Sequence, residues 1–281
     1  VLRRQRQMCI RDRFNNNDRP GIILSSAIKK YSDYYGVICG NENVLFTNND
    51  SAYETAISLF NKGIRVNAII DIRDKVTSSI VNQAEKLGIK IYNSFTIVDT
   101  SGYRRIKNIS IMKLSKDGQS VTGSKTQINC DCLGVSGGWT PAVHLFTQSG
   151  GKLKFDYDDN VFKPNKYPSD QISIGACNGE FDLDTIIKNF NNNIKTYLGI
   201  EKTNYENLNI SVSKEILKKN IWLLPSNKPI GKTKSFVDFQ NDATAKDIKL
   251  ALREGFRSIE HVKRYTTTGM GTDQGLSLIH I

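Results

Sequence analysis

NVLFTNNDSAYETAISLFNKGIRVNAIIDIRD, residues 43–74, is the stretch that predicts the fold of the chain. Residues 44–46 form a short apolar run that ends at a polar turn, residues 48–50, and residues 66–70 form a second, mostly apolar run. Between the two runs, four apolar residues recur at helical spacing: Ala52, Ala56, Ile57 and Phe60. Apolar strands joined by an amphipathic helix are typical of a parallel βαβ unit that is covered on both faces.

The residues that follow extend this α/β pattern and then change it. Residues 78–87 have the spacing of another helix, and residues 90–92 the character of another strand. FTIVDT, RIKNISIMKLS and KTQINCDCLGVSGGWTP then alternate apolar and polar residues between Ser-Gly and Asp-Gly turns. Such alternation predicts an antiparallel layer inserted beside the parallel sheet.

The turn after the first strand lacks the glycines of a dinucleotide-binding fingerprint. Such glycines let the backbone approach a pyrophosphate at a helix N-terminus, whereas here the turn reads Thr47-Asn48-Asn49-Asp50-Ser51-Ala52. Asp71 ends the second strand about 20 residues later, where a ribose-binding carboxylate is expected. Two interpretations remain open: a Rossmann-like domain kept as a scaffold, which the missing glycines favour, and an active nucleotide site.

The composition argues against several classes of function. The formal net charge is +11, but its cations are spread along the chain without interleaved aromatic residues, so we expect no nucleic-acid partner. No apolar run approaches 18 residues, so we expect no membrane span. Cys39, Cys130, Cys132 and Cys177 form no CxxC motif, which favours free thiols in a reducing cytoplasm. His144 and His261 are isolated and are interpreted as structural, so no catalytic residue and no metal ligand is predicted.

The two ends of the chain differ in character from the rest. Residues 3–13 match the translation of a common transposon-type sequencing adapter, and residues 276–281 match the translation of its reverse complement. We therefore expect residues 1–13 and 276–281 to be artefacts that flank a native internal fragment from about Phe14 to about Gly275. Five arginines and one aspartate near the start contribute +4, which leaves a net charge of about +7 for the fragment.

Three motifs make the chain resemble the alpha subunit of heterotetrameric sarcosine oxidase. They are VLFTNNDSAYETA, LGVSGGWTPAVHLFTQSGGKL and FVDFQNDATAKDIKLALREGFRSIEHVKRYTTTGMGTDQG. The resemblance implies an α/β, disulfide-reductase-like (Rossmann-type) nucleotide-binding region followed by a small helical domain. It places the second half of the first region at residues 14–197, a linker at 198–233 and the truncated helical domain at 234–275. The first glycine-rich fingerprint and a folate-binding domain would lie outside this chain.

The resemblance also implies chemistry, partners and location. Enzymes of this family oxidise sarcosine to glycine at a flavin in the beta subunit, with oxygen as acceptor, and give hydrogen peroxide and formaldehyde or 5,10-methylenetetrahydrofolate. The alpha subunit carries NAD, the beta subunit holds FAD, and covalent FMN lies near their interface. The expected protein is thus a cytoplasmic flavoprotein complex in which this chain assembles with beta, gamma and delta subunits. It would contribute no catalytic residue of its own.

A first departure from the wider superfamily suggests where NAD is held. QISIGACNGEFDLDTIIKNF resembles the segment in which a strand ends in Gly-Asp and the next helix points at a dinucleotide. Ala176 replaces the Asp that meets the sugar-alcohol chain of a flavin, which fits NAD. The residues that the resemblance implies as cofactor contacts are Gly175, Ala176, Asn178, Leu183 and Thr185. A plain strand-to-helix turn, with Gly179 near the helix start, is the alternative.

A second departure concerns the small helical domain. Related amine-oxidising enzymes hold a two-iron cluster there through cysteines, whereas Asp238, Gln240 and Asp273 stand at three of those positions. Oxygen ligands do not replace soft thiolates in such a cluster, so the domain is expected to survive as a packing and interface element without metal. Thr244 with Asp247 predicts a capping box.

The helix end HVKRYTTTGMG supplies the last predicted contacts. Lys263, Arg264 and Thr266 are expected to support the FMN phosphate at the alpha–beta interface. In the alternative interpretation the cations complement the helix C-terminus, which Gly269 caps. Two other functions remain open: the alpha subunit of a related opine, proline or dimethylglycine oxidase or dehydrogenase, and a non-catalytic nucleotide-binding assembly module.

Overall fold

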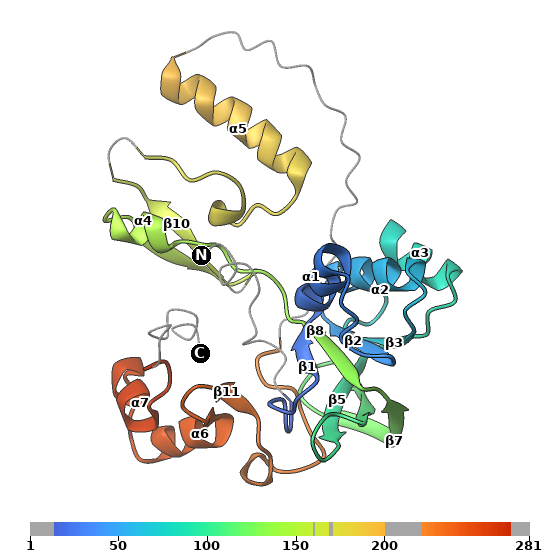
Figure 1. Ribbon diagram of the computed structural model, residues 1–281. Helices are drawn as coiled ribbons and strands as arrows, with labels where there is room; N and C mark the ends of the chain where they lie inside the picture. The colour runs from blue at the N-terminus through green and yellow to red at the C-terminus, as the bar shows by residue number, and fades with distance from the viewer. Residues whose placement is uncertain (1–13, 160, 169–170, 200–220, 271–281) are drawn as a thin grey trace. The chain divides into compact units, whose positions relative to one another are not determined.

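A computed structural model describes residues 14–159, 161–168, 171–199 and 221–270. These residues form two compact units (Figure 1). The larger unit contains residues 14–138 and 221–270, and the smaller unit contains residues 139–199. Within the described ranges, every helix is too short or too polar to cross a membrane.

The larger unit is built on a five-stranded parallel sheet with the order β1-β8-β2-β3-β4. Its strands are Ile22–Leu24 (β1), Asn43–Thr47 (β2), Val66–Asp71 (β3), Ile91–Asn93 (β4) and Cys132–Ser136 (β8). Phe46 on the central strand β2 pairs with Ile70 on β3 and with Val135 on β8. All residues of β2 are buried, as expected for a strand covered on both faces. The predicted parallel βαβ unit is confirmed.

Three helices cover one face of this sheet: Ser25–Tyr35 (α1), Ser51–Asn61 (α2) and Ser79–Lys86 (α3). Leu45 of β2 packs in the helix-side cluster, while its neighbours point to the opposite face because side chains alternate along a strand. The prediction that Phe60 lies on the buried side of α2 is wrong. The buried stripe passes through Leu59, which is 1% exposed, and leaves Phe60 41% exposed on the solvent side.

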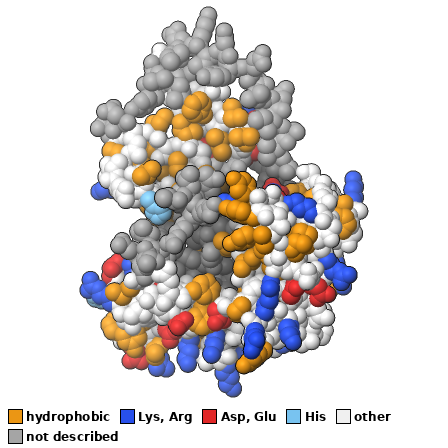
Figure 2. All heavy atoms as spheres, viewed as in Figure 1, with side chains coloured by type: hydrophobic (Ala, Val, Ile, Leu, Met, Phe, Trp, Pro, Cys, Tyr) orange, Lys and Arg blue, Asp and Glu red, His pale blue; other side chains and the backbone are white. Residues whose placement is uncertain are grey.

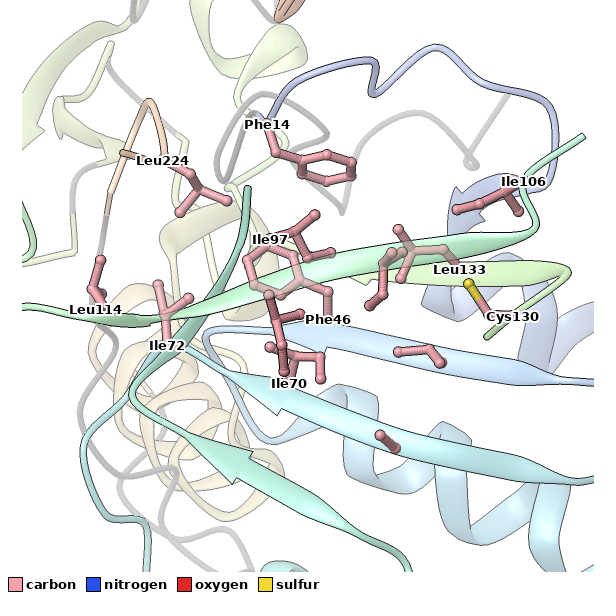
Figure 3. Packing of buried hydrophobic residues seen from close by; sticks show 14 residues of the cluster. Phe14, Phe46, Ile70, Ile72, Ile97, Ile106, Leu114, Cys130, Leu133 and Leu224 are labelled. Atoms are coloured by element: carbon pink, nitrogen blue, oxygen red, sulfur yellow. The ribbon is translucent and has the colours of Figure 1, made fainter. Parts of the chain in front are cut away.

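The prediction that KTQINCDCLGVSGGWTP lies entirely in an antiparallel layer is wrong for Cys132–Ser136, which forms β8 and pairs parallel with β2. The rest of the prediction is confirmed by a three-stranded antiparallel layer that covers the other face of the parallel sheet. Its strands are Phe95–Ser101 (β5), Asn108–Leu114 (β6) and Val121–Asn129 (β7), in the order β5-β6-β7. Ile97 from β5 joins Phe46 and Ile70 of the parallel sheet in one core cluster, which Figure 3 shows from close by. The two sheets therefore share a single apolar interior.

The segment after residue 220 brings a small helical domain to this core. Its elements are Ile230–Lys232 (η2, a 3-10 turn), Phe236–Asp238 (β11), Ala243–Thr244 (β12), Ala245–Arg253 (α6) and Ile259–Thr266 (α7). Leu224 is 4% exposed and belongs to the shared core cluster. The predicted cap of α6 is confirmed, because the Asp247 carboxylate accepts from both the backbone N–H and the hydroxyl of Thr244.

Two asparagines near the start of the described chain hold the same segment in place. The Asn15 side-chain oxygen accepts from the N–H of Lys234 at 2.7 Å. The Asn17 side chain accepts from the N–H of Phe236 at 2.8 Å and donates to its carbonyl at 3.0 Å. We call these three hydrogen bonds the asparagine clasp. They pair residues 219 positions apart in sequence.

The smaller unit consists of a hairpin and two helices. Its elements are His144–Gln148 (α4), Lys152–Asp156 (β9), Val161–Lys166 (β10), Gly175–Asn178 (η1, a 3-10 turn) and Leu183–Leu198 (α5). β9 and β10 pair antiparallel. The ammonium group of Lys163 lies 2.8 Å from the Asp156 carboxylate and 2.7 Å from that of Asp159, so it closes the hairpin by charge pairing.

Candidate functional site

The turn after β2 is filled with polar side chains. Thr47, Asn48 and Asn49 are all fully buried. The Asn49 amide donates to the carbonyl of Ser136 at 3.0 Å, and its oxygen accepts from the N–H of Ser51 at 3.0 Å. The hydroxyl of Thr47 donates to the Asn49 carbonyl at 2.8 Å. Side chains thus occupy the space that glycines leave open for a pyrophosphate in dinucleotide-binding proteins.

Asp71, at the position of a ribose-binding carboxylate, is engaged inside the protein. It is fully buried, and its carboxylate lies 2.7 Å from the guanidinium of Arg73. Arg73 also lies 2.8 Å from the Asp50 carboxylate, and the hydroxyl of Tyr53 donates to Asp71 at 2.8 Å. Burial, helped by the neighbouring Asp71 charge, raises the pKa of Tyr53, so its proton stays in this hydrogen bond. These contacts favour the scaffold interpretation of this turn.

The second candidate site lies in the smaller unit, where η1 precedes α5. Gly175, Ala176 and Asn178 lie in η1, and Gly175 has a φ of +79°, a backbone conformation suited to glycine. The resemblance implies a strand before Gly175. Residues 171–174 instead form no strand with the described residues. Ile174 has an extended backbone, but an extended segment becomes a strand only when it pairs with a neighbour.

A glutamate closes this loop from within. The Glu180 carboxylate accepts from the N–H of Gly175 at 3.4 Å and from the side-chain amides of Asn178 and Asn189 at 3.3 and 2.7 Å. Gly179 lies between these groups with a φ of +83° and ends η1. The backbone amide that was expected to approach a pyrophosphate therefore already donates to an internal anion.

The beginning of α5 is likewise occupied by a carboxylate. Asp182 accepts from the backbone N–H of Thr185 at 3.0 Å and from its hydroxyl at 2.7 Å. The hydrogen bonds from Thr185 lower the pKa of Asp182, so the cap is ionised at neutral pH. Leu183 is 51% exposed. With Glu180 and Asp182 in place, the loop suits the hydroxyl and amide donors of a dinucleotide better than its phosphates, because like charges repel.

The predicted phosphate contacts lie in the larger unit, at the end of α7. Lys263 is half-buried and Arg264 is exposed, and neither side chain has an ionic partner among the described residues. The hydroxyl of Thr266 donates to the Val262 carbonyl at 2.7 Å and lies 2.6 Å from that of Thr268. Figure 2 shows other Lys and Arg side chains on the surface formed by α6, α7 and the loop before β11. Cations rather than threonine hydroxyls are therefore available to an anion here.

The prediction that Gly269 caps α7 is wrong. The C-cap is Thr267, which adopts the left-handed conformation with a φ of +57°. Such a conformation is uncommon for a β-branched residue. The Gly269 N–H is engaged elsewhere: it donates to the Asp238 carboxylate at 2.7 Å.

Asp238, one of the residues at the predicted cluster positions, is a centre of hydrogen bonds. Its carboxylate is 7% exposed and accepts from the N–H groups of Gln240, Asn241 and Gly269 and from the Asn241 side chain. Gln240 is exposed, and Asp273 lies outside the described residues. In the part of the chain that the structure describes, no group of three acidic, histidine or cysteine side chains is arranged to hold a metal.

The remaining residues of interest have structural surroundings. Cys130 and Cys132 are buried, and burial raises the pKa of each thiol to about 12. Cys39 and Cys177 are only half-buried, so the four thiols are free but differ in exposure. The imidazoles of His144 and His261 form no hydrogen bond with a described residue. The sequence analysis missed the hydrogen-bonding roles of Arg73 and Glu180. Arg73 is 2 positions from Asp71 in the sequence, and Glu180 is 5 positions from Gly175. This closeness in sequence was the signal that could have revealed both roles.

Comparisons of the sequence with those of known proteins identify relatives of this chain. Residues 232–280 match the family described as Sarcosine oxidase A3 domain. The chain is 33% identical over 270 residues to sarcosine oxidase subunit alpha of Corynebacterium sp. (strain P-1), a match that covers 93% of this chain and 27% of the relative. It is 31% identical over 273 residues to sarcosine oxidase subunit alpha of Rhizobium meliloti (strain 1021), and this match covers 93% of this chain and 25% of the relative. The resemblance inferred from the sequence is thereby confirmed, and the chain spans about a quarter of the length of these relatives.

A solved structure shows the same fold. L-proline dehydrogenase from P. horikoshii matches with a TM-score of 0.50 and 15% identity, covering 97% of this chain and 49% of that one. The disulfide-reductase-like α/β fold predicted from the sequence is confirmed.

Asp238→Asn is expected to lower the free energy of unfolding at pH 7 by roughly 1–3 kcal/mol, because an amide places donors opposite backbone N–H groups. Burial raises the pKa of Asp238, but the hydrogen bonds from Asn241, Gly269 and Gln240 outweigh it and hold the pKa below its usual range. The stabilisation is therefore present above the unfolded pKa of about 3.9 and is lost as the pH falls through the folded pKa.

Urea unfolding of the 281-residue chain at several pH values measures this effect. The matched control is Asp242→Asn, since Asp242 is exposed and has a φ of +52°, which asparagine tolerates. Equal losses in the two variants at pH 7, or a gap that does not narrow as the pH falls below about 3.9, would show that Asp238 does not hold the loop through its charge.

Proposed function

We propose that this chain is part of the alpha subunit of a sarcosine oxidase, an oxidoreductase that works as a multi-subunit complex. The observation that carries the proposal is the identity of 31–33% to two such subunits, which extends over 93% of the chain. In the proposed reaction, sarcosine is oxidised to glycine at a flavin of the beta subunit with oxygen as acceptor. The products are hydrogen peroxide and formaldehyde or 5,10-methylenetetrahydrofolate, and gamma and delta subunits complete the complex.

In this proposal, the described part of the chain binds a cofactor and supports the subunit interface, and it contributes no catalytic residue. The scaffold turn at Asp71 is closed by its own side chains, and the histidines are isolated. Asp238 uses both carboxylate oxygens within its own domain, which supports a domain that packs without an iron–sulfur cluster. This favours sarcosine oxidase over an iron–sulfur opine or proline oxidase.

The test of the proposed function is oxygen uptake by the purified complete complex with sarcosine, dimethylglycine and proline, together with its iron content. We expect uptake to be fastest with sarcosine and iron to be absent. Faster turnover of proline or dimethylglycine, or a stoichiometric two-iron signal, would assign the chain to a related amine oxidase or dehydrogenase. A complex that oxidises none of them would be a nucleotide-binding assembly module.

NAD is the cofactor that we propose for the loop from Gly175 to Thr185. Gly175 and Ala176 support it, because neither carries more than a methyl group that would keep a ligand from the backbone of the turn. The carboxylate of Glu180 would accept from ribose hydroxyls, with Asn178 and Thr185 beside it. NAD, when bound, would supply a nicotinamide ring that can accept hydride.

Ala176→Phe is expected to lower the NAD content of the intact alpha subunit at least about tenfold, equivalent to about 1.4 kcal/mol, because the ring blocks the approach of a ligand to the backbone. Nucleotide extraction and mass spectrometry measure the content. Ala176→Gly, which removes only a methyl group, should keep NAD. If the Phe variant keeps full NAD while remaining folded, the dinucleotide is bound elsewhere.

Lys263 and Arg264 are proposed to support FMN at the interface with the beta subunit, with Thr266 holding the helix end. Charge-assisted hydrogen bonds to a phosphate are stronger than neutral ones, and both cations lack ionic partners among the described residues. FMN supplies the redox-active flavin, and these side chains only orient its phosphate.

The double variant Lys263→Ala, Arg264→Ala is expected to weaken FMN retention about tenfold to hundredfold, since one charge-assisted bond contributes roughly 1.5–3 kcal/mol. Flavin stoichiometry of the purified complex measures this, with assembly checked by size. Lys249→Ala, Arg257→Ala is the matched control, because both of its cations are exposed on the same small domain. Normal FMN content in the first variant would return Lys263 and Arg264 to a role at the helix end alone.

A further inference from the structure

The larger unit contains a cavity of about 480 Å³ that none of the sites above uses. It lies between β5, the turn that joins β6 to β7, and the segment that leads into the small helical domain. Its apolar lining comprises Phe14, Ile97, the run from Ile221 to Pro225, and Ile230. Pockets of roughly 300–1,000 Å³ that are lined by apolar and aromatic side chains are typical sites for small molecules.

The apolar wall of the cavity is firmly supported. Phe14 is 2% exposed and meets the ring of Phe46 edge-on, with the ring centroids 6.0 Å apart. Ile97 and Leu224 belong to the same core cluster as Phe14 (Figure 3). A wall held by the main core presents a fixed apolar surface, so a ligand need not order it on binding.

The charged groups at the cavity already have partners. The ammonium group of Lys228 lies 2.8 Å from the carboxylate of Asp99. The carboxylate of Asp117 accepts from the N–H of Gln119 at 3.0 Å and from the hydroxyl of Ser115. A charged ligand would compete with these contacts and lose its own hydration, so the cavity favours an uncharged molecule.

One hydroxyl at the cavity is available to a ligand. Ser235 is 4% exposed and lines the cavity, and its hydroxyl makes no hydrogen bond with a described residue. Its carbonyl accepts from the N–H of Ala245 at 2.9 Å, which fixes the backbone that carries the hydroxyl. The hydroxyl lies at the surface of the cavity, so it can donate to or accept from a polar group of a ligand.

We propose that this cavity binds a flat, uncharged aromatic molecule whose single polar group hydrogen-bonds to the hydroxyl of Ser235. The aromatic body packs against Phe14, Trp222 and Leu224. Gln119, exposed on the turn between β6 and β7, lies at the mouth of the cavity. The site is separate from the loop proposed for NAD and from the cations proposed for FMN.

Fluorescence titration of the full 281-residue chain with N-phenyl-1-naphthylamine tests the proposal. The chain has two tryptophans, so a Trp139→Phe background leaves Trp222 as the only donor for energy transfer to the bound dye. Saturable binding of one equivalent is expected. The anionic counterpart, 1-anilinonaphthalene-8-sulfonate, should bind at least about tenfold more weakly, because its sulfonate finds no free cation.

Three variants locate the dye. Ser235→Ala should weaken binding about threefold to tenfold, as expected for one hydrogen bond. Gln119→Phe should abolish it by filling the mouth, whereas Gln119→Ala should preserve it. Folding of each variant is checked by circular dichroism. Binding that is unsaturable, or unchanged in folded Gln119→Phe, or tighter for the sulfonate than for the neutral dye, would overturn the proposal.

Discussion

The buried ion pair between Asp71 and Arg73 is the contact on which the larger unit depends. Arg73 is 4% exposed and is held by Asp71 at the end of β3 and by Asp50 at the start of α2. Removing one partner of such a pair costs roughly 3–5 kcal/mol, because the other charge stays buried without compensation. Arg73, oriented by Asp71, therefore ties the carboxyl end of β3 to the turn after β2 through its contact with Asp50. The position of that turn determines how α2 covers one face of the sheet.

Carboxylates accept hydrogen bonds inside the protein at three places that bear on the candidate sites. Asp71 turns to Arg73 and Tyr53 instead of a ribose, and Glu180 accepts the amide of Gly175 where a pyrophosphate would approach. Asp238 joins β11 to the loop after α7, in a domain whose relatives are expected to use a metal cluster for the same purpose. In each case, internal hydrogen bonds or an ion pair hold the local backbone arrangement.

The sequence predicted those parts of the fold that depend on local patterns. The runs at residues 44–46 and 66–70 specified buried strands, and Thr244 with Asp247 specified a helix start. It did not predict contacts that depend on packing. The choice of Leu59 over Phe60 follows from how α2 rotates against the sheet, and periodicity fixes that rotation only to within one position. At the candidate sites, the sequence predicted which loops hold cofactors but not the role of Glu180, which requires the folded position of Gly175.

The asparagine clasp has a consequence for the order in which the protein folds. It joins residues 219 positions apart, so Asn15 and Asn17 cannot form these hydrogen bonds until the 219 residues that follow them have been synthesised. Synthesis at about 5–20 residues per second makes this delay roughly 10–45 seconds. During that interval the core surface that later receives Leu224 is open to other nascent chains. Apolar surface that stays exposed on a nascent chain is prone to aggregation, and the clasp closes the chain over such a surface.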